Sequence, residues 1–529
     1  MPPRLNRRHF LQTGLLGTAG LMTYEASALA AQATPAGEVL YNGIRLPTPW
    51  PPRIKNVPTE PAVPTYLTSP PAVIPIDIGR QLFVDDFLVE QTTLTRSHHR
   101  PIYHARNPVL TGGMVFSDGV WYDPQDQIFK MWYMSKGGTA YATSKDGLAW
   151  EKPRLDVVNG TNIVQTSSRD SSTIWLDLLE KDPKKRYKMF RSYSRPQMKS
   201  WCLWVHFSGD GIHWTDGQPT GACGDRSTAF YNPFRRVWAY SLRHGWGQPR
   251  RRRYWETPDD VVAGAQWGAN SAPAMWCGSD RLDPARPDYK VTPELYNLDC
   301  VAYESILIGL FTIWRGQFPE RPKPNEVCVG YSRDGWSWTR PDRRGFLPIS
   351  ENRKDWNWGN VQSAGGCCLV VGDQLHFYCS GRGAGNVTSL AILRRDGFTS
   401  MDAGPAEATL TTRPLRFRGR HCFVNVDAAK GELRVEVLDR DDQVIAPFSR
   451  ANCVPIRADR TIQRVQWQGA ADFGAVAEQT VKFRFHLTNG KLYAFWGSPA
   501  ATGASHGYIA AGGPGYNGLT DTVGTARKG

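Results

Sequence analysis

A short pattern, Ser-x-Asp-Gly-x-x-Trp, occurs three times in the chain and constrains its fold more than any other feature. It occupies residues 144–150, 208–214 and 332–338. In each copy we expect a strand to deliver the Ser, and the Asp to accept hydrogen bonds from nearby backbone N–H groups. The Gly supplies the positive φ of a tight turn, and the Trp packs at the start of the next strand. The pattern therefore predicts a repeated antiparallel unit whose aspartates have a structural role in turns.

Two weaker copies extend the series, with Asp259 before Trp267 and Asp396 before Phe398. The five aspartates are 49 to 75 residues apart, a period that fits one four-stranded sheet per repeat. The intervening strands are short and rich in aromatic and β-branched residues, with Gly, Asp and Pro between them. We therefore predict an all-β fold with a five-bladed β-propeller over residues 77–404.

The composition changes on both sides of the repeats. Residues 31–76 are rich in Pro, which predicts an extended arm. Residues 405–498 alternate apolar with polar side chains, as half-buried antiparallel strands do, so we expect a C-terminal β-sandwich after the propeller. Residues 499–529 form a Gly-rich tail in which Tyr508 and Tyr516 indicate some packing.

Residues 1–30 have the features of an export signal. Arg7 and Arg8 stand in a stretch similar to the twin-arginine motif, and the apolar segment 11–22 is too short to span a bilayer. Two small-x-small sequences follow as cleavage sites. We expect a twin-arginine signal peptide and a periplasmic or extracellular protein, since no later segment is apolar enough to cross a membrane.

The charge balance favours an acidic partner. The formal net charge is +14, and aromatic residues make up 12 % of the chain. An anionic polysaccharide is one candidate partner. Nucleic acid is not expected, because the basic residues are dispersed and no nucleic-acid motif occurs. The ten cysteines include no C-x-x-C and no His pair stands at metal spacing, so no zinc site and no cofactor are predicted. The oligomeric state is left open.

Five blades followed by a sandwich, with the repeated turn, resemble the five-bladed glycoside hydrolases. The segments 82–90, 130–133 and 186–189 are similar to segments of secreted bacterial members, and the similarity spans residues 76–498. The fructofuranosidase-like family 32 and the arabinanase- and xylosidase-like family 43 are the nearest groups. The resemblance implies a carbohydrate substrate and leaves a structural calcium ion in the central channel open. The family's W-x-N-D-P-N-G, R-D-P and E-C-P motifs are absent, so its catalytic acids cannot be assigned by motif.

Catalytic candidates therefore come from position. Glycoside hydrolysis needs one carboxylic acid and one carboxylate, and the innermost strands of a propeller bring such groups to its axis. Asp170, Asp225 and Asp299 stand at or near the starts of the first strands of blades 2, 3 and 4. We assign Asp225 as nucleophile or base, and Glu304, beside the aromatic Tyr303, as an acid of raised pKa. Asp170 or Asp299 would be the third carboxylate. The alternative for each is a hydrogen-bonded structural acid.

Four further residues are candidates for substrate binding. Asp85 and Asp86 are adjacent, so they face opposite ways on a strand, and Asp86 is a reserve candidate. Trp358, Asn360 and Gln362 open the fifth blade, where a ring could stack on sugar and amides could bind hydroxyls. Packing within the blade is the alternative for all three.

We therefore expect an exported glycosidase that uses paired carboxylates in the axial pocket of the propeller to cleave a poly- or oligosaccharide. One alternative is a non-catalytic glycan-binding propeller. Another is a lyase or epimerase, which would need a Tyr, His or Lys base beside an arginine that binds uronate. The sugar, the linkage and the stereochemical outcome are not predicted.

Overall fold

The computed structural model describes residues 37–525 except 167–168, 195–200, 244–248, 259, 269–270, 322 and 384. The predicted signal peptide, with Arg7 and Arg8, lies outside the described residues. Strands dominate the fold, and the single α-helix of the described part is α1 (Thr65–Thr68), which follows Pro64. No described helix has the length and apolar character needed to span a membrane.

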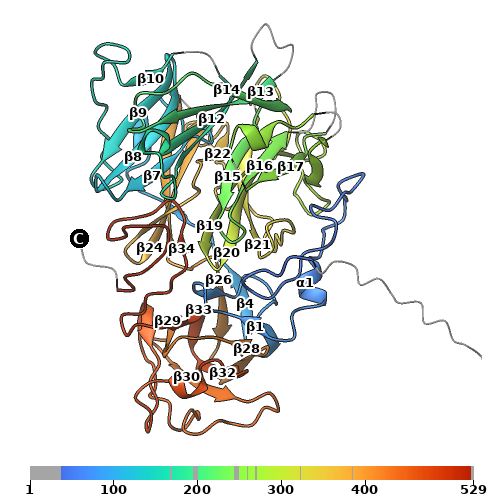
Figure 1. The fold of residues 1–529 in the computed structure, drawn as a ribbon, viewed down its shortest axis with the longest axis vertical. Coiled ribbons are helices and arrows are strands. Elements are labelled where there is room, and N and C mark those ends of the chain that lie inside the picture. Colours follow the sequence, from blue (N-terminus) through green and yellow to red (C-terminus); the bar gives the residue numbers. More distant parts are fainter. Residues whose placement is uncertain are drawn as a thin grey trace, which may run out of the picture. The chain divides into compact units, whose positions relative to one another are not determined.

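Five antiparallel sheets follow one another along the chain and lie in the upper part of Figure 1. Sheet 1 consists of β7 (Val120–Asp123), β8 (Ile128–Ser135), β9 (Gly138–Ser144) and β10 (Ile163–Gln165). Sheet 2 consists of β11 (Ser172–Leu176), β12 (Tyr187–Ser194), β13 (Trp201–Ser208) and β14 (Gln218–Cys223). Sheet 3 consists of β15 (Thr228–Asn232), β16 (Val237–Arg243), β17 (Arg252–Thr257) and β18 (Ala274–Cys277).

The last two of these sheets recruit strands from distant parts of the chain. Sheet 4 combines β19 (Glu294–Glu304), β20 (Ile306–Trp314) and β21 (Glu326–Ser332) with β34 (Tyr508–Ile509). Sheet 5 combines β22 (Val361–Ser363), β23 (Leu369–Val371), β24 (Gln374–Arg382) and β25 (Asn386–Arg394) with β5 (Ile102–Tyr103) and β6 (Leu110–Thr111). β5 and β6 precede sheet 1 in the sequence. The last sheet is therefore completed by strands that come before the first sheet along the chain.

Aromatic contacts link each sheet to the next, and the fifth to the first. The ring pairs, with centroids 5.1 to 6.0 Å apart, are Trp132–Tyr187, Phe190–Trp238, Trp276–Trp338, Phe346–Phe377 and Trp150–Tyr378. Most strand residues are buried on both faces, which explains why these strands read as apolar runs without alternation. The aromatic residues of the sequence thus serve mainly as a core shared between neighbouring sheets.

The repeated turns have the geometry that the sequence predicts. The Asp146 carboxylate accepts from the backbone N–H groups of Leu148 and Ala149 at 2.8 Å, and Gly147 has a φ of 73°. The Asp210 and Asp334 turns repeat these contacts. In the fourth turn the equivalent contacts are made by the aspartate at 260, while the predicted Asp259 lies outside the described residues. The structure confirms that these aspartates shape turns.

Two further sheets, in the lower part of Figure 1, combine N-terminal strands with C-terminal ones. One contains β2 (Gln81–Leu82), β4 (Thr95–His98), β26 (Thr399–Ala403), β29 (His421–Asp427), β31 (Asp459–Arg464) and β33 (Gly490–Ser498). The other contains β3 (Val89–Thr92), β27 (Ala408–Thr412), β30 (Glu432–Leu438) and β32 (Lys482–Thr488). A parallel pair of β1 (Ile74–Pro75) and β28 (Leu415–Arg416) lies beside them. Their apolar faces form a second core.

The segment around Asp85 corrects one sequence interpretation. Residues 83–87, predicted as a strand entering the propeller, form a bend, because the Asp85 side chain accepts from the backbone N–H of Phe87 at 3.2 Å. Phe83 and Phe87 are buried in the second core. The two buried rings thus fix the ends of a bend, where the sequence analysis placed a strand.

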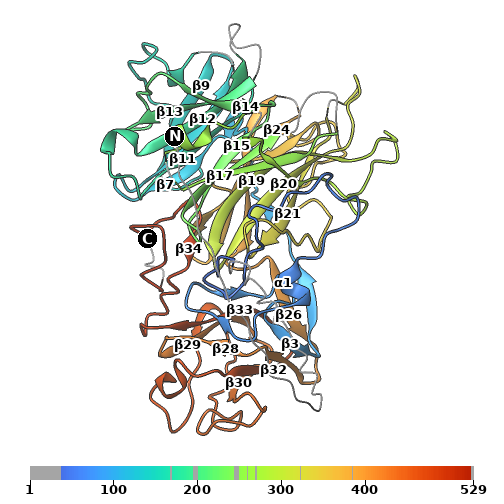
Figure 2. The same cartoon turned by 45° about the vertical axis from the view of Figure 1, so that its right-hand side comes forward.

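The C-terminal segment packs against the first set of sheets. Besides the pairing of β34 with β19, the Ala511 carbonyl accepts from Tyr122 of sheet 1, and the Gly512 carbonyl accepts from Val370 of sheet 5. Tyr516 is buried, as the aromatic residues of this Gly-rich stretch suggested. Figure 2 shows the segment running between the two groups of sheets, near β34.

Candidate active site

The segments that lead into the first strands of the sheets meet at one place. The Asp299 carboxylate, on β19, accepts from Ser117 at 2.9 Å, from Ser363 at 2.6 Å and from the side-chain amide of Asn297 at 3.0 Å. The guanidinium of Arg226, before β15, donates to the Ser117 hydroxyl at 3.0 Å. Sheets 1, 3, 4 and 5 therefore each contribute a polar group to the same point.

Sheet 2 joins this arrangement through Arg169, whose guanidinium donates to Asp118 at 2.7 Å. Asp170 follows directly and stands two residues before β11. On the neighbouring sheet, Asp225 forms an ion pair with Arg243 at 2.7 Å. We call the whole set the strand-start cluster, which comprises Ser117, Asp118, Arg169, Asp170, Asp225, Arg226, Arg243, Asn297, Asp299 and Ser363.

Two of the four acidic residues in the strand-start cluster are partly exposed. Asp118 and Asp299 are buried, at 0 % and 3 % exposed. Asp170 is half-buried, and the Asp225 side chain is 22 % exposed. Asp170 and Asp225 are therefore the carboxylates that a ligand could reach first.

The environments of Asp170 and Asp225 differ. Burial raises the pKa of Asp170, and the negative charge of Asp225 raises it further against the opposing effects of Arg226, Lys323 and Arg169. Asp225 lies against its own cation, Arg243, which stabilises its negative charge. Burial and the neighbouring acid thus favour the protonated form of Asp170, which is the form that a general acid requires.

The buried carboxylates are incompletely satisfied. Burial raises the pKa of both Asp118 and Asp299, although Arg169 and the donors around Asp299 oppose the rise. In the described part of the chain, one carboxylate oxygen each of Asp118, Asp170 and Asp299 has no hydrogen-bond partner. Buried acceptors without partners are costly, so these oxygens are suited to hydroxyl groups or water.

The structure brings together three of the four predicted catalytic residues. Asp170, Asp225 and Asp299 belong to the strand-start cluster. Gln362 precedes Ser363 on β22, and its amide donates to Asn360 at 3.0 Å. Both amide side chains are buried at the edge of the cluster.

Two predicted binding residues lie elsewhere. Trp358 stands in a loop where its ring faces the guanidinium groups of Arg321 and Arg353. Asp86 is exposed and pairs with Arg96 of β4 at 2.6 Å. No described contact connects Asp86 with the strand-start cluster.

Glu304, the predicted acid, lies at the far end of β19 from Asp299. Five residues of extended strand separate them, about 16 Å. Glu304 is fully buried, and its carboxylate pairs with Arg395 at 3.1 Å and accepts from the backbone N–H of Arg80 and from Ser505. Burial raises its pKa, as expected, but no acid of the strand-start cluster faces it. We call its surroundings the junction cluster: Arg80, Tyr303, Glu304, Arg395, Asp396, Ser505 and Asp521.

The sequence analysis missed Asp118 and the arginines Arg169, Arg226 and Arg243. The positional rule that selected Asp170 also applies to sheet 1, where Asp118 stands two residues before β7. The arginines adjacent to the predicted aspartates in sequence, at 169 and 226, were the available signal for the cations.

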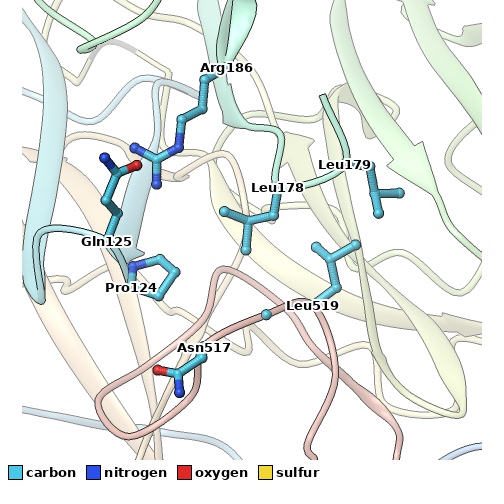
Figure 3. A pocket seen from close by; sticks show the side chains of 8 residues that line it. Pro124, Gln125, Leu178, Leu179, Arg186, Asn517 and Leu519 are labelled. Atoms are coloured by element: carbon cyan, nitrogen blue, oxygen red, sulfur yellow. The ribbon is translucent and has the colours of Figure 1, made fainter. Parts of the chain in front are cut away.

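One well-defined pocket lies away from these acids. It measures about 450 Å³ and lies where the first strands of sheets 1 and 2 end. Figure 3 shows its lining of Pro124, Gln125, Leu178, Leu179, Arg186, Asn517 and Leu519. Its one charged residue, Arg186, is already paired with Asp123. A pocket without a carboxylate in its lining cannot supply the two acids of glycoside hydrolysis. Separately, no group of three or more His, Cys, Asp or Glu in the described ranges is arranged to hold a metal ion.

Comparisons with known proteins give only distant likenesses. No family model matches the chain, and no curated protein matches it. Among solved structures, an N-acetylgalactosamine deacetylase from F. plautii is 12 % identical with a TM-score of 0.38, covering 57 % of this chain and 94 % of its own. A GH130-family structure is 13 % identical at a TM-score of 0.37 over 56 % and 94 %. An endo-arabinase from Bacteroides thetaiotaomicron is 10 % identical at 0.35 over 56 % and 96 %. We therefore base the function on the residues of the chain itself.

Proposed function

We propose that the protein is a five-bladed β-propeller with a C-terminal β-sandwich that acts as a glycosidase on a poly- or oligosaccharide. Sheets 1 to 5 are the blades, and the strand-start cluster lies at one end of their axis. The order of the sheets, the contacts from each to the next and the convergence of their first strands support this interpretation.

The pairing of Asp170 with Asp225 carries the functional proposal. They come from neighbouring sheets, lie close enough for the charge of one to raise the pKa of the other, and are the two partly exposed acids of the cluster. Asp170 takes the role of general acid that the sequence analysis gave to Glu304, because its raised pKa favours the protonated form that donates to the leaving oxygen. Asp225 is the nucleophile or the base that activates water.

The two buried carboxylates support this pair. Asp299 is held by three donors from three segments, and Asp118 is held by Arg169 next to the proposed acid. Their free oxygens can accept from sugar hydroxyls, and their charges can stabilise the positive charge that develops on the sugar ring.

A glycan library tests the proposal. The wild-type protein should release shortened products from at least one glycan. Asp170→Asn, which keeps the size of the side chain, should slow that release by a factor on the order of 10²–10⁴. Asp146→Ala, in a turn far along sheet 1, is the matched control and should cleave at the wild-type rate. Binding without product release by the wild type would instead support a non-catalytic glycan-binding protein.

One observation favours a second candidate, a lyase that acts on uronates. Tyr296 of β19 lies beside Arg226, and its hydroxyl accepts from Lys323 at 3.4 Å. A tyrosine next to cations is the arrangement that proton abstraction beside a uronate carboxylate needs. An unsaturated product that disappears in Tyr296→Phe but persists in Asp225→Asn would select this candidate over hydrolysis.

Export is a further part of the proposal, supported by the sequence of residues 1–30. Replacing Arg7 and Arg8 with lysines should leave the protein in the cytoplasm if the twin-arginine pathway exports it. Fractionation of expressing cells measures this directly, and continued export of the variant would contradict the assignment.

A further inference from the structure

Cations and aromatic rings alternate beside the proposed catalytic acids. Arg226 lies over the Phe116 ring, 3.8 Å from its centroid, and 5.6 Å from that of Tyr296. Arg382 lies 5.4 Å from the Phe116 centroid, and Lys323 lies 5.5 Å from that of Tyr296. Sheets 1, 3, 4 and 5 thus build a continuous array, which we call the cationic row: Arg382, Phe116, Arg226, Tyr296 and Lys323.

The three cations of this row have no carboxylate of their own. Elsewhere in the cluster Arg169 is paired with Asp118 and Arg243 with Asp225. Within the described residues, no ion pair joins Arg226, Arg382 or Lys323 to an acid. The Arg382 guanidinium instead donates to the Met114 sulfur, and Lys323 donates to a tyrosine hydroxyl. These cations lie in a partly desolvated place without an ion pair, and all three share the negative charge of Asp170, so a ligand that supplies further negative charge would be favoured.

The charges of the neighbouring acids do not remove this excess. Burial raises the pKa of Asp118, Asp170 and Asp299, because it disfavours the charged form of each acid. Burial, together with the nearby Arg226, lowers the pKa of Arg382, which means that its positive charge is under-compensated. Arg382 and Lys323 are also half-exposed, whereas Arg226 is 1 % exposed. Those two can therefore meet a ligand, while Arg226 adds to the positive potential behind them.

We propose that the cationic row binds an anionic substituent, a carboxylate or a sulfate ester, on the sugar next to the bond that Asp170 and Asp225 cleave. Arg382 and Lys323 contact the substituent, and the faces of Phe116 and Tyr296 keep the cations in place. This inference rests on the proposed glycan activity and adds its substrate class. A fork of parallel N–H donors on Arg382 suits both oxyanions, and Lys323 adds a point charge.

Matched pairs of oligosaccharides test this inference. One pair is a uronic-acid oligosaccharide and its carboxyl-reduced form, and the other is a sulfated oligosaccharide and its desulfated form. Binding is measured by calorimetry in an Asp170→Asn background, so that bound sugar is not cleaved. The acidic member of one pair should bind at least about tenfold more tightly than its neutral partner, about 1.4 kcal/mol, and the difference should shrink as salt is raised. The pair that shows the preference identifies the substituent.

Variants of the cationic row then test whether its residues cause the preference for acidic oligosaccharides. Arg382→Gln with Lys323→Gln should abolish the difference between acidic and neutral members. Arg382→Lys should keep part of it, and Arg440→Gln, an exposed arginine of the second group of sheets, should keep all of it. Thermal unfolding shows that each variant is folded.

Three results would overturn the inference: equal binding of acidic and neutral members, a preference that survives the double substitution, or no binding of either acidic member. The first of these is compatible with the proposed glycosidase if a neutral glycan is cleaved in a manner that depends on Asp225. The experiments can therefore show that the proposed anionic substrate class is wrong while the proposed glycosidase activity holds.

Discussion

The chain contains two clusters of acids and arginines, and they differ in how far the chain itself satisfies the carboxylate oxygens. In the junction cluster every oxygen of Glu304, Asp396 and Asp521 accepts a hydrogen bond, and these side chains are fully buried. In the strand-start cluster, three aspartates each keep an oxygen without a partner and two acids reach solvent. In the first cluster the chain itself satisfies every carboxylate oxygen and only arginine N–H groups, on Arg80 and Arg395, lack a partner, whereas in the second cluster carboxylate oxygens are left for a ligand.

This difference indicates which of the acids with a raised pKa is a candidate for catalysis. Burial raises the pKa of Glu304 as it raises that of Asp170. Arg80 and Arg395 hold the pKa of the adjacent Asp396 down against its burial, so the junction cluster is a compensated ion network. A raised pKa alone thus does not mark a catalytic acid. Partial exposure and unsatisfied carboxylate oxygens separate the two cases.

The largest expected effect is on turnover. Asp225→Asn keeps the shape of the side chain but removes the proposed nucleophile or base. Product release should fall by a factor on the order of 10²–10⁴, because the remaining acid cannot complete the reaction alone. Initial rates on the glycan identified by the library measure the effect, and circular dichroism should show an unchanged fold. A rate within a few-fold of wild type would remove Asp225 from the site.

The largest expected effect on stability belongs to the other cluster. Glu304→Gln leaves Arg80 and Arg395 facing a neutral group in a fully buried place. Breaking a buried ion pair in this way costs about 3–5 kcal/mol. Denaturant unfolding should show this loss, while the folded fraction keeps its turnover. Unchanged stability combined with lost turnover would reverse the roles that we assign to the two clusters.

The pH dependence of stability sharpens the comparison further. Asp170 has a raised pKa in the folded protein, so its contribution to stability is complete below the unfolded value of about 3.9. That contribution is lost as the pH rises through the folded-state pKa. The free energy of unfolding of Asp170→Asn should therefore increase relative to wild type as the pH rises from about 3.9 to neutrality. A constant difference across this range would contradict the raised pKa.

The smallest expected effect is in the repeated turns. Asp210→Ala removes the acceptor for two backbone N–H groups in an exposed turn, which should cost about 1 kcal/mol of unfolding free energy. Turnover should not change. Chemical denaturation and initial rates measure both quantities, and a loss of activity at unchanged stability would show that the repeat has more than a structural role.

The sequence predicted the features that depend on local contacts. The Asp146, Asp210 and Asp334 turns are set by hydrogen bonds within five residues, so their roles could be read directly. Asp170 and Asp225 could be found because each stands just before a first strand, whereas Asp299, expected at or before such a strand, lies in the middle of β19. Five sheets of similar length follow from the spacing of the repeat.

The rest depends on contacts between distant segments. The pairing of β5 and β6 with β25, and of β2 and β4 with the C-terminal strands, leaves no local pattern in the sequence. Glu304 has the apolar neighbours of a buried acid, but those neighbours do not say which end of β19 faces the other acids. The ion pair of Asp118 with Arg169 joins residues 51 apart and could not be inferred from either segment.

The most direct measurement of the central claim is turnover in the double variant Asp170→Asn with Asp225→Asn, compared with each single variant. If the two carboxylates act as one catalytic unit, the double variant will be about as slow as the slower single variant, because removing one partner already disables the step. A double variant that cleaves as fast as wild type, or two single variants that both do, would contradict the account.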